Sequence, residues 1–224
     1  MPAETPGHQL APPALGLQLA LPEAPPDMQS YAVFDLETTG LRPASDHVIE
    51  IGWCVVQSGV VMPARSLLVQ SPVPVPPEVQ QLTGITPDLL AREAIPLRTA
   101  LDRFLADCGG LALVGHNVVR FDAFFLEAAC LRAGLPAPAR GRYRDTAALY
   151  KAQRLSLRRR PDEDHWAFAC RALDRPAPGL RYSLSRCCAE LGITMAGITT
   201  HRAAGDVTLT QQLYAKLAVS APVP

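Results

Sequence analysis

Acidic side chains stand at positions where the hydrophobic pattern favours apolar ones, and two of them are close neighbours. Asp35 and Glu37 lie in the segment FDLETTG, at the end of a short β-rich run. Because side chains alternate along a strand, both carboxylates are expected on one face, with Phe34 and Leu36 on the other. Two carboxylates at this spacing repel each other unless a cation lies between them, so the pair indicates a divalent metal site. Polar residues that merely end a strand before a Thr-Gly turn would give the same pattern.

A third carboxylate, Asp122, lies in the segment GHNVVRFDAFFLEAACLRAG. The helix expected over residues 118–133 is so apolar that most of its faces must be buried. A carboxylate beside Phe121 and Phe124 is costly without a partner. Asp122 and Asn117 would equally well serve the positive end of the helix dipole, so both interpretations stay open.

Asp206 extends the apolar stripe of the last expected helix, in which Leu209, Leu213 and Leu217 recur. Its carboxylate is therefore expected to point into the domain. His201 precedes it by five residues, which on a continuous helix would separate the two by about 140° and about 7.5 Å along the axis. The two converge only if His201 lies on the loop before the helix. A lone histidine is more often a loop or core residue than a catalytic one.

The elements that must position these residues follow from hydrophobic periodicity. Three consecutive β-rich runs predict an antiparallel meander whose second strand alternates around Glu50 and whose third is interrupted by Pro63. Strands first, then alternating strand and helix, predict an α/β fold with a mixed sheet. The expected strands are residues 31–36, 48–56, 60–69 and 111–114, and the expected helices are 96–108, 118–133, 145–154, 182–191 and 203–217.

Length and composition limit the class of protein. With 224 residues, 48% of them hydrophobic and 19% charged, the chain suits one sizeable globular domain and excludes a disordered or fibrous protein. Seven prolines in residues 1–29 predict a flexible leader, so the domain is expected at residues 30–218 with a tail at 219–224.

The same composition bears on location. No apolar run approaches the roughly 20 residues that span a bilayer, and the N-terminus lacks the pattern of a secretion signal. The six cysteines form no CxxC pair, which favours reduced, buried thiols over disulfides or zinc. We therefore expect a cytoplasmic protein without a membrane partner.

The formal net charge of zero conceals an asymmetry. Residues 1–112 carry 5 basic and 12 acidic side chains, net −7, whereas residues 113–224 carry 16 basic and 9 acidic, net +7. A basic surface of this kind would bind phosphates, and an Arg-rich solvated surface is the alternative interpretation. The cluster at residues 140–160 comprises Arg140, Arg142, Arg144, Lys151, Arg154, Arg158, Arg159 and Arg160.

Three segments together resemble the motifs of the DEDDh, or DnaQ-like, 3′-to-5′ exonucleases, of which the proofreading domain of the DNA polymerase III epsilon subunit is an example. The segments are FDLETTG, GHNVVRFDAFFL and HRAAGD, in that order. The resemblance covers about residues 30–218 and also includes LTGITPDLL, RDTAALY and YSLSRCCAELGIT. It implies a ribonuclease-H-like fold with a mixed five-stranded sheet flanked by helices.

The resemblance also implies a site. Two divalent ions, Mg²⁺ or Mn²⁺, would activate a water and stabilise the leaving 3′-oxygen of a phosphodiester, with His201 as the general base. The substrate would be a nucleic acid with a free 3′ end, single-stranded DNA or RNA, and a DNA polymerase or repair protein is a candidate partner. The implied metal ligands are Asp35, Glu37, Asp122 and Asp206, and the implied substrate-binding residues are Leu36, Thr38, Thr39, Leu82 and Thr83.

Two departures from the family pattern stand out. Three residues separate Asn117 from Phe121 where many members have two, and the stretch 154–179 is longer and more polar than usual, which suggests a substrate-binding insertion or a partner-docking loop. Two other functions remain as alternatives: a phosphodiesterase for very short oligonucleotides, and a non-catalytic module that docks nucleic acid or a polymerase.

Overall fold

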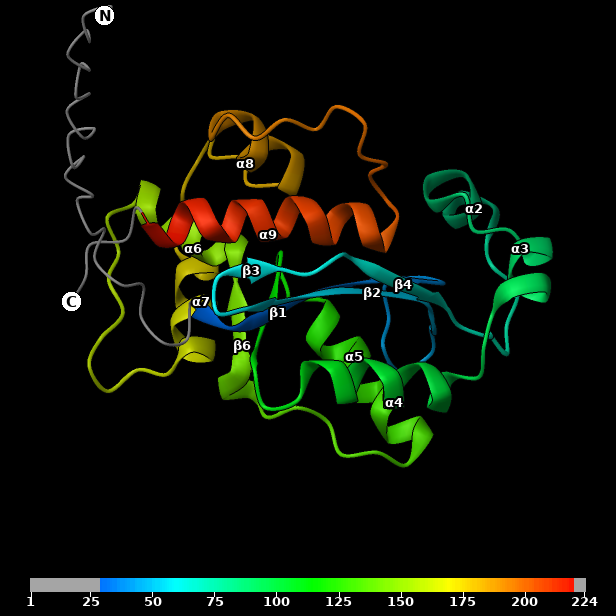
Figure 1. Ribbon diagram of the computed structural model, residues 1–224. Coiled ribbons are helices and arrows are strands. Elements are labelled where there is room, and N and C mark those ends of the chain that lie inside the picture. The colour runs from blue at the N-terminus through cyan, green and yellow to red at the C-terminus, as the bar shows by residue number, and fades with distance from the viewer. Residues whose placement is uncertain (1–28, 220–224) are drawn as a thin grey trace, which may run out of the picture.

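A mixed six-stranded sheet lies between helices in the computed structural model, which describes residues 29–219 (Figure 1). The long helix α9 (Ala203–Val219) covers one face, and α4 (Leu97–Cys108) with α5 (Asp122–Ala133) covers the other. The leader expected at residues 1–29 and the tail expected at 219–224 lie outside the described residues, apart from Gln29 and Val219. The strands are β1 (Tyr31–Thr38), β2 (Val48–Gln57), β3 (Val60–Val61), β4 (Arg65–Leu68), β5 (Ala112–Gly115) and β6 (Tyr143–Asp145).

The sheet confirms the meander followed by parallel strands. The strand order is β3-β2-β1-β5-β6, in which β1 is antiparallel to β2 and parallel to β5, and β5 is parallel to β6. The expected number of five strands was wrong because the third expected strand is divided. Both β3 and β4 pair with β2, and Pro63 lies between them. Proline has no N–H to donate to the ladder, so the strand breaks there.

Several helices differ from the expected ranges. The expected helix 118–133 begins only at Asp122, because Asn117 adopts a left-handed conformation (φ 60°) and a turn follows it. The expected helix 145–154 is α6 (Thr146–Arg154), and the expected helix 182–191 is α8 (Leu184–Glu190). The helices that periodicity did not predict are α2 (Pro77–Thr83), α3 (Pro87–Glu93), α7 (His165–Asp174) and the short 3₁₀ helix η1 (Arg140–Arg142).

The polar stretch at 154–179 contributes to the core rather than standing apart from it. Within it, α7 begins with Asp164, whose side chain accepts a hydrogen bond from the Ala167 N–H (2.7 Å). Its apolar side chains Phe168 and Ala172 are buried in the main core cluster with residues of β1 and α4. The helix was missed because charged residues surround a short apolar stripe.

Alternation along β1 creates both the core and the site. Phe34 points toward α4, where its ring lies 5.6 Å from that of Phe104. Tyr31 points to the other face, and its ring meets that of Tyr214 on α9 at 4.9 Å. The same period carries Asp35 and Glu37 onto the α9 face, at the carboxyl end of the strand.

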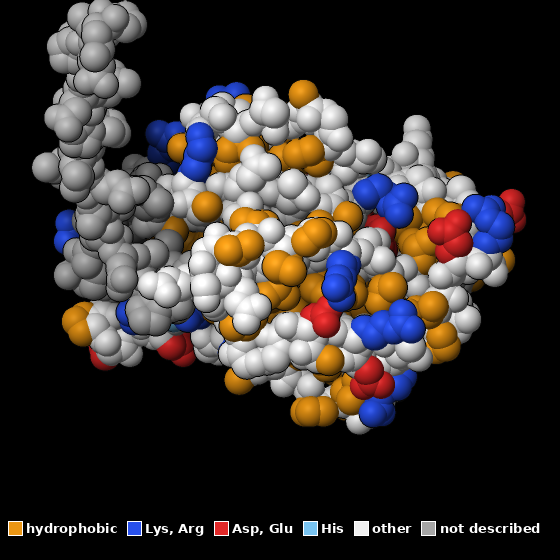
Figure 2. Space-filling model, viewed as in Figure 1, with side chains coloured by type: hydrophobic (Ala, Val, Ile, Leu, Met, Phe, Trp, Pro, Cys, Tyr) orange, Lys and Arg blue, Asp and Glu red, His pale blue; other side chains and the backbone are white. Residues whose placement is uncertain are grey.

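Apolar side chains gather on the face over β3 and β4, and Val60, Val61 and Met62 are among the exposed ones (Figure 2). All six cysteines are free thiols, and five of them are buried. Among residues 29–219, no helix combines the length and apolarity needed to cross a membrane.

Close packing of β2 on α9 yields a prediction about stability. A Cβ atom added at Gly52 would lie 2.6 Å from the Ala203 carbonyl carbon, in the first turn of α9. We expect Gly52→Ala to lower the free energy of unfolding by about 1–3 kcal/mol, because the helix must move away from the sheet. Denaturant unfolding would measure the change. Gly110→Ala is the control, since a Cβ atom there meets nothing within 4 Å. Equal effects of the two substitutions would contradict the argument.

Candidate active site

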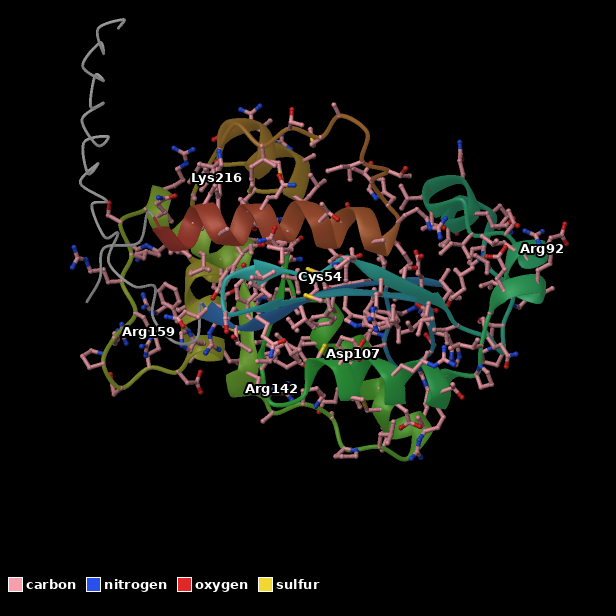
Figure 3. All side chains as sticks on the ribbon, viewed as in Figure 1. Cys54, Arg92, Asp107, Arg142, Arg159 and Lys216 are labelled. Carbon is pink, nitrogen blue, oxygen red and sulfur yellow. The ribbon has the colours of Figure 1, made fainter. Side chains whose placement is uncertain are left out.

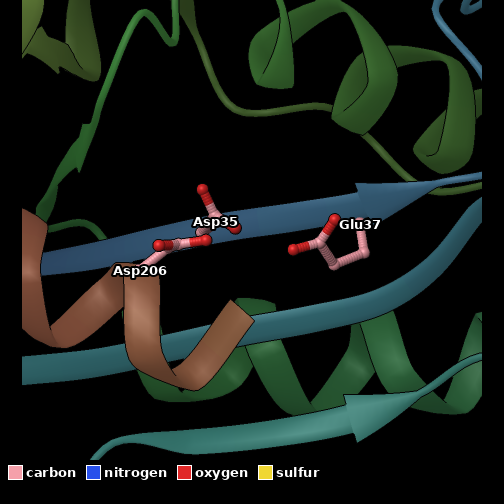
Figure 4. A group of neighbouring side chains, drawn as sticks. All are labelled: Asp35, Glu37 and Asp206. Atoms are coloured by element: carbon pink, nitrogen blue, oxygen red, sulfur yellow. The ribbon is translucent and has the colours of Figure 1, made fainter. Parts of the chain in front are cut away.

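Three acidic side chains from distant parts of the chain meet at the carboxyl end of β1. Asp35 and Glu37 come from β1 and Asp206 from the first turn of α9 (Figure 4). One carboxylate oxygen from each lies within 4.8 Å of the others. The sequence-based expectation that Asp206 points inward, toward the other acids, is thus met by the structure.

The electrostatics of this group favour a cation. Burial raises the pKa of Asp35 well above its usual value, and the acidic neighbours Asp122, Glu37 and Asp206 raise it further. Burial is also the largest cause for Glu37, whose pKa rises to about 8. The pKa of Asp206 is raised by burial, against the opposing effect of the His201 N–H. Carboxylates that repel one another in this way are stabilised when a divalent ion binds between them.

The donor set decides which ions fit. The group offers only carboxylate oxygens, with no thiolate or imidazole among its members. Such hard ligands suit Mg²⁺ or Mn²⁺ better than zinc, which prefers sulfur and nitrogen. The residues present therefore fit the divalent cation that the sequence implied.

Asp122 approaches the same place but has a partner of its own. It is the first residue of α5 and is buried, and its Oδ1 accepts a hydrogen bond from the Leu36 N–H (3.2 Å). Burial raises its pKa to about 7, although this N–H lowers it. Asp122 lies outside the three-residue group. The two interpretations of Asp122 are compatible, because it is both a helix-start acid and a neighbour of the cluster.

A further buried carboxylate, Asp145, holds the loop that leads to Asp122. Its side chain accepts hydrogen bonds from the N–H groups of Asn117 (3.2 Å) and Val119 (3.1 Å), and from Ala148 (3.0 Å) at the start of α6. It therefore ties the left-handed turn to the end of β6. Sequence reasoning did not identify this role, although an acid directly before the first residue of a helix is a capping signal.

His201 lies on the loop immediately before α9, as its convergence with Asp206 requires. Its backbone is left-handed (φ 57°), and its N–H donates a hydrogen bond to Asp206 Oδ2 (2.9 Å). The side chain is exposed. His116, in the second motif, is placed differently: its ring nitrogens contact Thr146 Oγ1 and the Tyr182 carbonyl oxygen, both at 2.9 Å. Burial lowers the pKa of His116 to about 4, which favours the neutral form of its ring.

A pocket of about 470 Å³ adjoins the carboxylates. Glu37 is shared between the pocket and the acidic group. Phe121 and Glu78 also line it, and sequence reasoning did not propose either residue for substrate binding. All five residues expected to bind substrate are among its walls, namely Leu36, Thr38, Thr39, Leu82 and Thr83.

The basic cluster at 140–160 is largely occupied in holding the protein together. Arg142 donates to the carbonyl oxygens of Gly109 and Leu111, and the buried Lys151 donates to that of Leu173. Arg140 pairs with Glu127 and stacks on Trp166, while Arg154 pairs with Glu190.

The basic cluster also lies at a distance from the acidic group. Arg159 lies on the side of the molecule where α9 ends, whereas Asp206 lies in its first turn (Figure 3). With 17 residues, α9 is about 25 Å long. The cluster thus lies well away from the acidic group, and whether it binds phosphates stays a prediction.

Comparison with known proteins shows the family of this chain. The model of the RNase_T exonuclease family matches residues 32–214. Among curated relatives, the PolC-type DNA polymerase III of Caldanaerobacter subterraneus subsp. tengcongensis is 31% identical over 105 residues, 47% of this chain. That of Clostridium perfringens is 33% identical over 97 residues, 43% of this chain. In each case the matched region is 7% of the polymerase.

Solved structures show the same fold. Escherichia coli exonuclease I in complex with a dT13 oligonucleotide superposes with a TM-score of 0.62 and 19% identity, over 86% of this chain and 41% of that one. Exonuclease X in complex with 5′ overhanging duplex DNA gives a TM-score of 0.55 and 23% identity, over 84% of this chain and 90% of that one. The family match spans most of the described residues, and the chain therefore belongs to the RNase_T exonucleases, the DnaQ-like family of 3′-to-5′ exonucleases.

Proposed function

We propose that this chain is a metal-dependent 3′-to-5′ exonuclease that hydrolyses the terminal phosphodiester bond of DNA or RNA. The observation that carries the proposal is the meeting of Asp35, Glu37 and Asp206 beside an open pocket. Family membership supplies the reaction class, and the acidic group supplies a site with the right chemistry for it.

In this proposal four carboxylates, those of Asp35, Glu37, Asp122 and Asp206, hold two divalent ions. The chemistry that such ions contribute is activation of the attacking water and stabilisation of the leaving 3′-oxygen. His201 takes the proton from the water. Its exposed ring can exchange that proton with solvent, and its N–H bond to Asp206 keeps the residue beside the acidic group.

The pocket would receive the terminal nucleotide. Along the chain, Leu36 lies between Asp35 and Glu37, and two threonines, Thr38 and Thr39, directly follow them. A base or sugar in the pocket therefore brings its phosphate to the carboxylates. Leu82 and Thr83 on α2 form the opposite wall, where their apolar atoms would pack on the bases.

Relatives and neighbours support DNA as the first substrate to test. The curated relatives are DNA polymerases, and exonucleases I and X have been solved with DNA. A polymerase or repair protein is accordingly the partner we propose, and free cysteines fit a reducing compartment such as the cytoplasm.

The first experiment tests polarity and metal dependence together. Oligonucleotides of DNA and RNA, labelled at the 5′ or the 3′ end, would be incubated with Mg²⁺, with Mn²⁺ or with EDTA. We expect a ladder of shortened 5′-labelled products and early release of the 3′ label, both abolished by EDTA. A length series from two nucleotides upward separates this function from a phosphodiesterase that accepts only very short oligonucleotides. Cleavage that survives EDTA would refute the proposal.

Asp206→Asn separates a metal ligand from a helix-start acid. Burial raises the pKa of Asp206, so its ionised form destabilises the metal-free fold. This destabilisation is absent below about pH 4 and grows as the pH rises through the folded pKa. We expect Asp206→Asn to leave the metal-free protein as stable or more stable at pH 8, with a smaller gain at pH 4. The value of kcat should fall by about two orders of magnitude or more. Thermal melts and single-turnover rates measure both. A loss of up to about 1 kcal/mol with kcat intact is the result expected of a helix-start acid.

His201→Ala tests the general base. A general base must be unprotonated to accept the proton of the attacking water, so the wild-type kcat at saturating metal should fall on acidification. The substitution should lower kcat by about 10²-fold or more and weaken this pH dependence, with metal affinity nearly unchanged. The matched control is His116→Asn, at a histidine outside the acidic group. A His201→Ala protein with the wild-type pH profile would exclude His201 as the base.

A further inference from the structure

A fifth carboxylate, Glu50, is buried beside the acidic group, and the proposed reaction does not use it. It lies on β2 directly opposite Glu37 in the β1–β2 ladder, and its side chain is 1% exposed. A buried charge of this kind is costly unless it is paired and fully hydrogen-bonded.

Three residues satisfy Glu50 with four hydrogen bonds. The Arg202 guanidinium binds it through both oxygens, with Nη2 2.9 Å from Oε1 and Nε 3.1 Å from Oε2. The Ala203 N–H donates to Oε2 (3.1 Å), and the Ser66 hydroxyl on β4 donates to Oε1. Two parallel N–H bonds to one carboxylate fix orientation as well as distance.

These contacts hold the part of the chain that carries two of the proposed site residues. Arg202 directly follows His201, and Ala203 begins α9, with Asp206 one turn later. Glu50 therefore occupies one of the free N–H groups at the start of α9, in the manner of a capping residue supplied by another element. The close approach of Gly52 to Ala203 leaves the helix little room to shift along β2.

Stability alone is a weak explanation for this arrangement. A buried ion pair often contributes less to folding than apolar residues of the same size. Here Glu50 also places a further negative charge next to Glu37 and raises the pKa of that carboxyl, while its partner Arg202 lowers it. A carboxylate in this position is explained better by what it aligns.

We infer that Glu50 and Arg202 are positioning residues, which set the backbone of His201 and the carboxylate of Asp206 against Asp35 and Glu37 on β1. This role rests on the proposed function, since the residues it aligns are the proposed base and metal ligands. Glu50 acts through α9, without touching substrate or the reacting atoms.

The test compares Glu50→Gln with a matched control. Glutamine keeps the size of the side chain but brings an N–H₂ group against the guanidinium. We expect kcat at saturating Mn²⁺ to fall at least tenfold, with KM for a short oligonucleotide unchanged within twofold. In the metal-free protein, amide hydrogen exchange at His201 and Ala203, measured relative to global stability, should become at least tenfold faster.

Asp107→Asn is the control, because Asp107 is also a carboxylate that joins a helix to β-structure. It accepts hydrogen bonds from Trp53 Nε1 (3.0 Å) and Arg65 Nη1 (2.9 Å) and lies on α4, across the sheet from α9 (Figure 3). We expect it to lower the melting temperature while kcat and exchange at His201 stay within twofold of wild type. Ser66→Ala, which removes one neutral donor from Glu50, should give a two- to fivefold change in the same direction as Glu50→Gln.

The outcomes are distinct. A Glu50→Gln protein that melts earlier but keeps wild-type kcat and wild-type exchange at His201 would overturn the inference, since Glu50 would then serve stability alone. If Glu50→Gln does not fold, Ser66→Ala decides by the same two readouts. A wild-type protein without metal-dependent cleavage would refute the proposed function, and the exchange rates in the metal-free protein would still decide whether Glu50 positions the start of α9.

Discussion

Repulsion among carboxylates at the carboxyl end of β1 is the constraint around which this structure is built. Asp35, Glu37 and Asp206 bring oxygens within 4.8 Å of one another, and burial raises the pKa of each. The metal-free fold must offset this cost with packing elsewhere, such as the contact of Phe34 with Phe104 on the far face of β1. A divalent cation that binds between the carboxylates is attracted to each of them and offsets their mutual repulsion. The repulsion in the metal-free fold therefore favours binding of the cation that the proposed reaction needs.

On both sides of the acidic group, a buried acid outside the group holds the chain just before a helix. On the α5 side, Asp145 accepts hydrogen bonds from backbone N–H groups of the loop that leads to Asp122. On the α9 side, Glu50 accepts hydrogen bonds from the Ala203 N–H and the Arg202 guanidinium, shortly before Asp206. Each buried acid binds the chain shortly before a helix start and so places a site carboxylate without joining the cluster. Helix N-termini also suit this purpose because their partial positive charge favours nearby acids.

Several basic residues in the second half of the chain form contacts within the protein. Arg142 and Lys151 bind backbone carbonyl oxygens, and the exposed Arg154 pairs with Glu190, so part of the basic excess in the second half of the chain makes contacts within the fold. The pocket next to the carboxylates is lined instead by Leu36, Leu82 and threonines. Recognition of a terminal nucleotide at this place would depend on packing and backbone contacts more than on a basic surface.

The sequence by itself determined the period of β1, and with it the shared face of Asp35 and Glu37, because alternation is a property of any strand. It also determined the inward direction of Asp206 and the need for His201 to precede the helix, since both follow from helical geometry. Tertiary structure alone decided that Asp122 would bond to the Leu36 N–H and that the start of α9 would be held by Glu50. These outcomes depend on contacts between residues up to 153 positions apart, and local propensity carries no information about such contacts.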